Sequence, residues 1–301
     1  MNKLILKSCP LCGSTQIKHS LTCMDFYASR ERFEVFSCEA CGFVFTQGIP
    51  SGDEINKYYE SSDYISHSDT KKGLMNTLYH RVRKYMLNKK ARMVVREAHR
   101  QSGRLLDIGT GTAYFPNAMM KKQGWEVEAV EKNADARAFA KEKFNIDVKS
   151  VDALNEFSPA SFDVITLWHV MEHLENLHET WDRLFELLEA KGILIIAVPN
   201  QASYDAQKYG SDWAAYDVPR HLWHFTPGTM QQLASKHGFI MAERYPMPFD
   251  AFYISMLSER NKGSRFSFLK GMYVGTIAWF HALIKKERSS SMIYIFRKKT
   301  K

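Results

Sequence analysis

LLDIGTGTAYF, residues 105–115, combines an apolar segment with a glycine-rich turn. Glycines let the backbone approach a bound ligand closely, and a helix that starts after such a turn offers free N–H groups. This combination is typical of proteins that bind nucleotide-type cofactors. Several cofactors use such a turn, so the surrounding residues must identify the one bound here.

Strand-like and helix-like segments alternate from Arg104 onward. Apolar segments predict five strands, at 104–109, 126–133, 146–154, 162–170 and 193–200, and amphipathic segments predict helices at 113–124, 134–145 and 178–192. This alternation predicts an α/β fold with a Rossmann-like, doubly wound, mostly parallel sheet. The late apolar segment 290–299 completes an antiparallel terminal hairpin, which brings the expected sheet to seven strands.

Four of the five cysteines form two matching pairs, Cys9 with Cys12 and Cys38 with Cys41. Each pair belongs to a Cys-x-x-Cys-Gly motif, in which a tight turn directs two thiolates at one ion. Disulfides are disfavoured because the first residues do not resemble a secretory signal, and a redox pair would need only one such motif. The two motifs therefore predict a structural zinc ion bound by four sulfurs. Cys23 is left over and is expected to be a buried, small apolar residue.

These patterns divide the chain into three regions. Residues 1–48 are expected to form a zinc ribbon, residues 49–100 a helical linker or lid, and residues 101–301 a cofactor-binding domain with a helical insertion at about 258–288. The longest nearly uncharged apolar segment, 271–284, is shorter than the ~20 residues that span a bilayer. We therefore expect a soluble, cytoplasmic protein.

The net charge of +8 is unevenly distributed. Residues 51–104 carry 12 basic and 6 acidic side chains and residues 259–301 carry 11 and 2, whereas residues 105–258 carry 13 and 21. An acidic centre with basic flanks can face phosphates, anionic lipid or nucleic acid, and solvated basic helices are the simpler alternative. Residues 1–50 carry 5 basic and 4 acidic side chains, a near neutrality that disfavours nucleic-acid binding through the ribbon.

Glu131 ends the second predicted strand, twenty residues after Gly111, where its carboxylate can accept both hydroxyls of a ribose. This position fits NAD as well as S-adenosylmethionine. Ala113 stands where the dinucleotide pattern has its third glycine, and Asp107 suits a cationic amino-acid ligand but would repel a pyrophosphate. Together with the terminal hairpin, these two residues favour S-adenosylmethionine.

LLDIGTGTAYF, Glu131, VDALNEF (151–157) and FDVITLWHVMEHL (162–174) resemble the successive motifs of class I S-adenosylmethionine-dependent methyltransferases, over roughly residues 100–245. The resemblance implies methyl transfer, with the glycine turn against the amino-acid portion of the cofactor. It further implies that Glu131 binds the ribose and that the next motif binds the adenine edge. The implied cofactor residues are Asp107, Gly109, Thr110, Gly111, Glu131, Asp152, Ala153 and Trp168.

A narrower resemblance joins the cysteine motifs, YISHSDTKKG (64–73) and DVPRHLWHFT (217–226) to a bacterial subgroup of these enzymes. Members of this subgroup are associated with polysaccharide or other envelope biosynthesis. The subgroup implies a small or carrier-linked acceptor, such as a sugar or a lipid-linked intermediate. Tyr64 and His67 are expected to belong to a lid over the cofactor, with an ordinary linker as the alternative.

His169, Arg220 and His221 are the candidates for chemistry at the acceptor. His169 directly follows the fourth predicted strand, where the reacting methyl group should project, and an imidazole titrates near neutral pH. Arg220 and His221 follow the fifth strand, where arginine can offer a planar fork of donors to an anionic acceptor. As a structural alternative, His169 would pack beneath the cofactor. The loop 217–225 would, in the same way, pack against the next helix.

HVMEH, residues 169–173, resembles a motif in which two histidines bind one metal ion. No third ligand is evident in the sequence. His173 is therefore interpreted as a residue that forms hydrogen bonds at the start of a helix.

The segment 268–288 consists of an apolar, aromatic part, 268–284, flanked by Lys285, Lys286 and Arg288. It predicts a helical cap over the acceptor pocket, with peripheral contact to an anionic membrane as the alternative. Three other functions remain open at this stage. An RNA methyltransferase would use the ribbon and the basic helix to grip RNA, an adapter would bind the cofactor without turnover, and a dehydrogenase would bind NADH.

Overall fold

The computed structural model describes residues 3–50, 52–59, 74–122 and 124–299. Side chains are described for these residues except at 52–53 and 74–82. The two predicted lid residues, Tyr64 and His67, lie outside the described residues.

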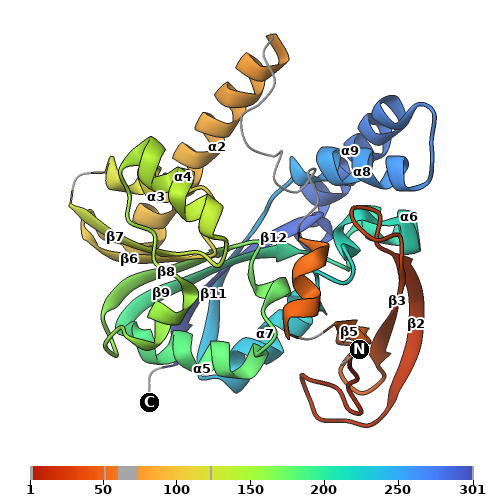
Figure 1. Ribbon diagram of the computed structural model, residues 1–301, viewed down its shortest axis with the longest axis horizontal. Helices are drawn as coiled ribbons and strands as arrows, with labels where there is room; N and C mark the ends of the chain where they lie inside the picture. The colour runs from red at the N-terminus through yellow and green to blue at the C-terminus, as the bar shows by residue number, and fades with distance from the viewer. Residues whose placement is uncertain (1–2, 51, 60–73, 123, 300–301) are drawn as a thin grey trace.

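Within the described residues, the central sheet has six strands in the order β11-β12-β9-β8-β6-β7 (Figure 1). They are β6 (Gly103–Ile108), β7 (Trp125–Val130), β8 (Phe162–Trp168), β9 (Leu188–Pro199), β11 (Phe239–Pro246) and β12 (Ser291–Lys298). The strands β6 to β9 are parallel to one another, and β12 and β11 continue the sheet in antiparallel pairing. The predicted Rossmann-like, mostly parallel sheet with an antiparallel terminal hairpin is therefore confirmed.

One expected strand, residues 146–154, is almost absent from this sheet. Lys149 forms a single parallel bridge with Val130, and the chain then turns into the short 3-10 helix η2 (Val151–Asn155). Ile146 is buried but Asp147 and Lys149 are exposed, so this segment has little apolar surface to bury at the outer edge of the sheet. The expected seventh strand is thus reduced to one bridge.

Helices cover both faces of the sheet. In Figure 1, α2 (Leu74–Ala98), α3 (Tyr114–Met120) and α4 (Ala134–Phe144) lie above it, and α5 (Leu177–Leu187) and α7 (Pro227–Lys236) lie below it. This two-sided cover explains why the central strands are buried along nearly their whole length, with β9 buried from Ile193 to Val198.

Helix α5 shows how the apolar spacing determines the packing. Its buried residues Leu177, Trp181 and Leu184 recur at intervals of three and four and therefore lie on one helix face. The helix ends at Leu187 and not at 192 as predicted, because Leu188 already pairs with Phe162 of β8. The ladder shifts register after this pair, so the intervening residues of β9 form an irregularity at the start of the strand.

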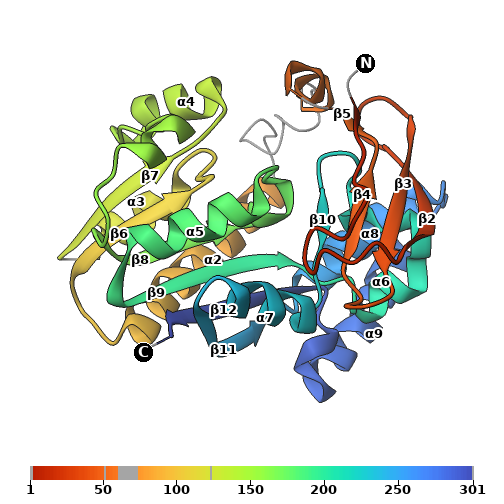
Figure 2. The same ribbon diagram turned by 90° about the horizontal axis from the view of Figure 1, so that it is seen from below.

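The N-terminal region forms a second sheet of four strands, in the order β10-β4-β3-β2 (Figure 2). Three of them, β2 (Ile17–Met24), β3 (Arg32–Cys38) and β4 (Val44–Gln47), come from the ribbon. The fourth, β10 (Trp223–His224), comes from the loop that follows β9 and pairs antiparallel with β4. Two short strands, β1 (Lys3–Leu4) and β5 (Ile49–Pro50), pair beside this sheet, and the 3-10 helix η1 (Gly52–Tyr58) follows.

The four paired cysteines converge at the base of the ribbon. The Sγ atoms of Cys9 and Cys41 lie 3.6 Å apart, and so do those of Cys12 and Cys38. A tetrahedral zinc ion with Zn–S bonds of about 2.3 Å separates its sulfurs by about 3.8 Å. The cluster is therefore compatible with one structural zinc ion. Cys23 lies outside the cluster and is buried, as predicted.

Two helices stand between β11 and β12, namely α8 (Asp250–Asn261) and α9 (Ser267–Ile284). They pack closely because α9 presents glycines to α8. A Cβ atom at Gly271 would lie 2.5 Å from the Cα atom of Met256, and one at Gly275 would lie 2.8 Å from the Cα atom of Phe252. None of the helices in the described part of the chain is long and apolar enough to span a membrane. The remaining short helices are α6 (Tyr204–Tyr209), η3 (Met171–His173), η4 (Gly210–Asp212), η5 (Ala214–Tyr216) and η6 (Lys286–Arg288).

Replacing one cluster cysteine should release the ribbon zinc. For Cys12→Ser we expect the zinc content to fall by about one ion per chain and the thermal midpoint to drop, because a small ribbon depends on its metal for folding. Cys23→Ala is the matched control, since it changes a cysteine outside the cluster and should keep the zinc. Elemental analysis with thermal unfolding measures both effects, and an unchanged zinc content in Cys12→Ser would contradict the assignment.

Candidate functional site

The glycine turn between β6 and α3 is held at the carboxyl ends of the parallel strands. Gly109 has φ +67°, and a Cβ atom there would lie 2.5 Å from Cγ2 of Val170, so only glycine fits beside the segment that follows β8. A Cβ at Gly111 would meet no atom within 4 Å, which shows open space beside the turn. Glu131 accepts a hydrogen bond from Gly111 N at 2.8 Å and another from Asn133 N at 2.9 Å. The turn and the acidic residue predicted to bind the cofactor are therefore in direct contact.

Asp107 is buried at the end of β6 and accepts a hydrogen bond from the Thr166 hydroxyl at 2.5 Å. Burial raises the pKa of its carboxyl group to about 6, against the opposing effect of this hydrogen bond. Thr110 follows in the turn itself. These positions agree with the cofactor site that the sequence predicts, and the contacts of Asp107 and Thr110 with a cofactor stay predictions.

Trp168 and Lys90 form the next part of this site. The Lys90 Nζ atom lies 4.2 Å from the centre of the Trp168 ring, and Phe115 packs edge-on against the same ring. The indole N–H of Trp168 is buried and has no hydrogen-bond partner among the described residues. A buried donor without a partner is costly, so this N–H is available to a bound molecule.

Asp152 and Ala153, the predicted adenine-binding residues, lie in η2. The Ser150 hydroxyl donates a hydrogen bond to Asp152 at 3.1 Å, and Ala153 is buried. η2 contacts β7, the strand that ends beside Glu131. The two residues thus stand on the same side of the sheet edge as Glu131, and their contact with adenine stays a prediction.

His169 occupies the left-handed region of backbone conformation directly after β8, with φ 58°. Such a conformation is unusual for a residue other than glycine and often marks a functional position. Its Nδ1 atom lies 3.5 Å from Glu172 Oε1 and its Nε2 atom 3.6 Å from Asp250 Oδ2. Burial lowers the pKa of His169, but Glu172 and Asp250 outweigh it, so the pKa lies above its ordinary value.

A cavity of about 350 Å³ opens beside His169 at the carboxyl ends of β8 and β9. His221 and Asp217 form part of its wall, and α8 contributes Asp250 and Tyr253. Its volume is within the range of small-molecule sites. The cavity therefore brings together two of the predicted catalytic residues, His169 and His221, beside the expected position of the methyl group.

His173 lies behind His221, which lines the cavity, and the centres of the two rings are 4.5 Å apart. His221 Nδ1 is 2.8 Å from the carbonyl oxygen of Ala215, and His173 Nδ1 is 3.0 Å from that of Arg220. A carbonyl oxygen only accepts, so both Nδ1 atoms carry the proton. Burial, reinforced by nearby His221, lowers the pKa of His173 to about 4, so that its ring is neutral near pH 7.

Arg220 does not grip an acceptor, and this prediction is corrected. The side chain is 1% exposed and faces away from the cavity into the ribbon interface. Its guanidinium donates to Asp25 Oδ1 at 2.9 Å, to Asp217 Oδ1 at 2.6 Å and to the carbonyl oxygen of Tyr58 at 2.8 Å. The donors are therefore used inside the protein. The position in the loop was predicted correctly, but the direction of the side chain depends on Asp25, which is 195 positions away.

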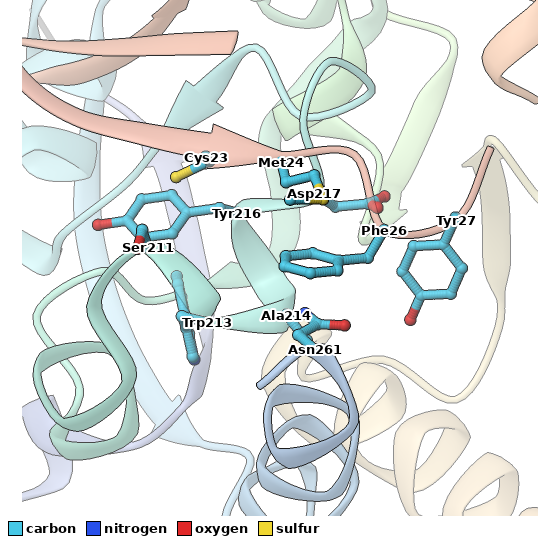
Figure 3. A pocket seen from close by; sticks show the side chains of 10 residues that line it. All are labelled: Cys23, Met24, Phe26, Tyr27, Ser211, Trp213, Ala214, Tyr216, Asp217 and Asn261. Carbon is cyan, nitrogen blue, oxygen red and sulfur yellow. The ribbon is translucent and has the colours of Figure 1, made fainter. Parts of the chain in front are cut away.

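The ribbon supports the loop 217–225 at several points. Thr46 Oγ1 donates to the carbonyl oxygen of His221 at 2.7 Å, and Phe43 stacks on Trp223. Leu222 N in turn donates to the carbonyl oxygen of Glu172 at 2.8 Å, which ties the loop to η3. Figure 3 shows the other end of this interface, where Phe26 and Tyr27 of the ribbon approach Asp217 and Asn261 around a narrow space of about 10 Å³. The ribbon thus forms one wall of the site.

Sequence reasoning missed three residues of this region, Lys90, Asp250 and Glu172. Lys90 comes from α2 and Asp250 from the first turn of α8, and neither belongs to a recognised motif. Glu172 lies inside HVMEH, but the sequence does not show that it is close to His221, which is 49 positions away. A search for acidic residues among the histidines of both segments could have found Glu172.

A sequence model of the methyltransferase domain family matches residues 78–243, which is more than half of the chain. The chain belongs to this family.

An uncharacterized methyltransferase from Staphylococcus carnosus (strain TM300) is 28% identical over 126 residues, which cover 41% of this chain and 59% of that protein. The chain thus spans about three fifths of the length of this curated relative.

Two solved structures with TM-scores of 0.51 share the fold. A candidate sarcosine dimethylglycine methyltransferase from Galdieria sulphuraria is 15% identical and covers 71% of this chain and 86% of its own. The cyclase SpnF is 14% identical and covers 71% and 81%. One of these relatives is named for methyl transfer and the other for cyclisation, so the fold leaves the reaction open.

Replacement of Arg220 should destabilise the protein strongly. For Arg220→Met we expect a loss of about 3–5 kcal/mol in the free energy of unfolding, because Asp25 and Asp217 would stay buried without their cation. Urea unfolding followed by circular dichroism measures the loss. Arg244→Met is the control, since its ion pair with Glu287 is partly exposed and should be worth about 0–1 kcal/mol. Equal losses in the two variants would contradict the buried role of Arg220.

Proposed function

We propose that this protein transfers a methyl group from S-adenosylmethionine to a small or carrier-linked acceptor bound in the His169 cavity. The observation that carries the proposal is the position of His169 and Val170 between two sites. Val170 packs against Gly109 of the cofactor turn, and His169 lines the cavity. The family membership supports the reaction type, and the size of the cavity supports a small acceptor group.

The residues around the glycine turn fit the cofactor. Open space lies beside Gly111, the Glu131 carboxylate is fixed at the edge of this space, and the Trp168 N–H is without a partner in the described structure. When bound, S-adenosylmethionine supplies a methyl group on a positively charged sulfur. The protein has to align the acceptor with this group and exclude water from it.

In this proposal, His169 takes a proton from the acceptor. Its Nδ1 faces Glu172 and its Nε2 faces Asp250, so two carboxylates stabilise the protonated ring. The raised pKa of His169 makes it a stronger base than an ordinary histidine. His221 and Asp217 form another part of the same wall and would orient the acceptor.

The helix pair α8–α9 supports an acceptor carried at a membrane surface. Asp250, Tyr253, Ile254 and Leu257 of α8 line the cavity. The predicted cap, residues 268–284, lies in α9, which packs on α8 and contributes no lining residue in the described part of the chain. On α9, exposed apolar side chains include Leu269, Tyr273 and Ile284, at 66%, 69% and 86% exposure. Residues 265–286 contain four basic side chains besides His281 and no acidic ones. This combination fits the interface of an anionic bilayer, where apolar groups insert and cations contact headgroups.

The activity can be tested with S-adenosylmethionine that carries a radiolabelled methyl group, incubated with separated metabolite, lipid and RNA fractions of a bacterial extract. We expect label in the metabolite or lipid fraction and a loss of about 10²–10⁴ in rate for His169→Gln. Cofactor affinity should stay unchanged in this variant. His19→Gln, an exposed histidine of the ribbon, is the control.

The pH dependence provides a second readout of the same role. A base must be deprotonated to act, so the rate should fall as the pH drops through the raised pKa of His169. Label in RNA would instead support docking of nucleic acid, and tight cofactor binding without label in any fraction would support an adapter. A wild-type rate in His169→Gln would exclude this histidine as the base.

Membrane contact can be measured by flotation with vesicles. The protein should float with vesicles that contain anionic phosphatidylglycerol and much less with pure phosphatidylcholine. We expect Leu269→Ser combined with Tyr273→Ser to abolish flotation, because the inserted apolar area is lost. Met120→Ser changes an exposed apolar residue of α3 and serves as control. A dimer that dissociates in the double variant would show that α9 binds a second copy instead.

A further inference from the structure

Glu172, in η3, is a buried carboxylate that accepts no hydrogen bond from the described part of the chain. The residue is 1% exposed, and neither of its oxygens has a hydrogen-bond partner among the described residues. Its closest charged neighbour is His169, whose Nδ1 lies 3.5 Å from Oε1. Burying a carboxylate that accepts no hydrogen bond costs roughly several kcal/mol, unless a nearby cation compensates its charge. The His169 ring compensates part of this charge, but both oxygens still accept no hydrogen bond from the described residues, so a further cation would stabilise them.

Two histidines lie close to this carboxylate. The ligand-type atoms of Glu172, His173 and His221 all lie within 4.8 Å of one another. A tetrahedral ion with bonds of about 2.1 Å separates its ligands by about 3.4 Å, so binding requires the atoms to approach by at most about 1.4 Å. Rotation of the side chains can provide such a shift. In the sequence, HVMEH suggests the pair His169 and His173, without an evident third ligand. The structure instead groups His173 with Glu172 and with His221 of the loop 217–225.

The two rings are already in the tautomer that binds a metal ion. Each donates its Nδ1 proton to a backbone carbonyl, His173 to that of Arg220 and His221 to that of Ala215. In a neutral ring this arrangement leaves the lone pair on Nε2. Histidines that bind metals usually hold their second nitrogen in this way, because the hydrogen bond fixes the ring. The Tyr59 hydroxyl lies 3.3 Å from the same His173 Nδ1, and Asp217 Oδ2 lies 3.8 Å from His221 Nε2.

The backbone also fixes these ligands relative to one another. Glu172 and His173 belong to η3, and His221 belongs to the loop that Thr46 and Phe43 of the ribbon support. Leu222 N binds the carbonyl oxygen of Glu172, so both segments are joined directly. The three side chains are therefore preorganised and do not depend on a metal for their approximate positions.

From these observations we propose that Glu172, His173 and His221 form a second metal site, separate from the ribbon cysteines, for a divalent ion such as Zn²⁺. Two imidazoles and one carboxylate suit ions of intermediate softness. His221 also lines the cavity, so the ion borders the acceptor site. This site does not depend on the proposed methyl transfer.

The test starts from protein whose ribbon holds zinc and from which weaker metal has been removed with a mild chelator. Titration with Co²⁺ should add one equivalent, with visible absorption but without the strong charge-transfer band of cobalt–thiolate bonds. Zn²⁺ should compete for this equivalent and raise the thermal midpoint. Glu172→Gln should weaken binding of both ions at least about 100-fold. Glu97→Gln, a buried carboxylate near Tyr245, should bind like the wild type.

Three results would overturn the proposal. The first is no additional equivalent of Co²⁺ or Zn²⁺ in the zinc-loaded wild type. The second is a thiolate band, which would place the cobalt in the ribbon. The third is unchanged affinity in a folded Glu172→Gln. If Glu172→Gln does not fold, His173→Asn takes its place, and the wild-type titration still decides whether the second site exists.

Discussion

The buried contact of Arg220 with Asp25 and Asp217 is the interaction on which the site depends. It joins the ribbon, η1 and the loop 217–225 at one point, where Arg220 and Asp25 are shielded from water and Asp217 is partly exposed toward the cavity. Burial opposes ionisation of Asp25, but hydrogen bonds from Ser29 and the charge of Arg220 hold the pKa of its carboxyl group below the ordinary value. The charges therefore stabilise each other, and the loop is fixed in the conformation that presents His221 to the cavity.

The ribbon consequently has a structural role in the site. Its apolar residues Phe43 and Phe45 belong to the same buried cluster as Trp181 of α5 and Phe225 of the loop. The pairing of β10 with β4 extends the ribbon sheet into the methyltransferase domain. A ribbon that carries part of the domain's core cannot easily act as an independent docking module. This agrees with its near-neutral charge.

Much of the fold follows from local patterns in the sequence. The glycine turn, the apolar strands and the cysteine spacing each involve neighbouring residues, so Gly109, Glu131 and Cys9 could be assigned from their surroundings. The prediction of a strand at 146–154 was wrong because its few apolar residues lie at the edge of the sheet, where β-propensity alone does not ensure strand pairing. Arg220 and Glu172 were misjudged or missed because their partners are distant in sequence. The direction of a side chain in a loop depends on such partners and not on the loop's own composition.

The close packing of α9 on α8 has a thermodynamic consequence. Gly271 and Gly275 bring the backbone of α9 directly against that of α8. The opposite side of α8 forms part of the cavity wall. If a molecule bound to α9 displaces α8 through this contact, a ligand in the cavity acts on α9 by the same route. Binding of a membrane surface to α9 and binding of the acceptor in the cavity are then linked, and linkage is reciprocal. A membrane that increases the affinity for the acceptor is itself bound more tightly, by the same factor, when the acceptor is present.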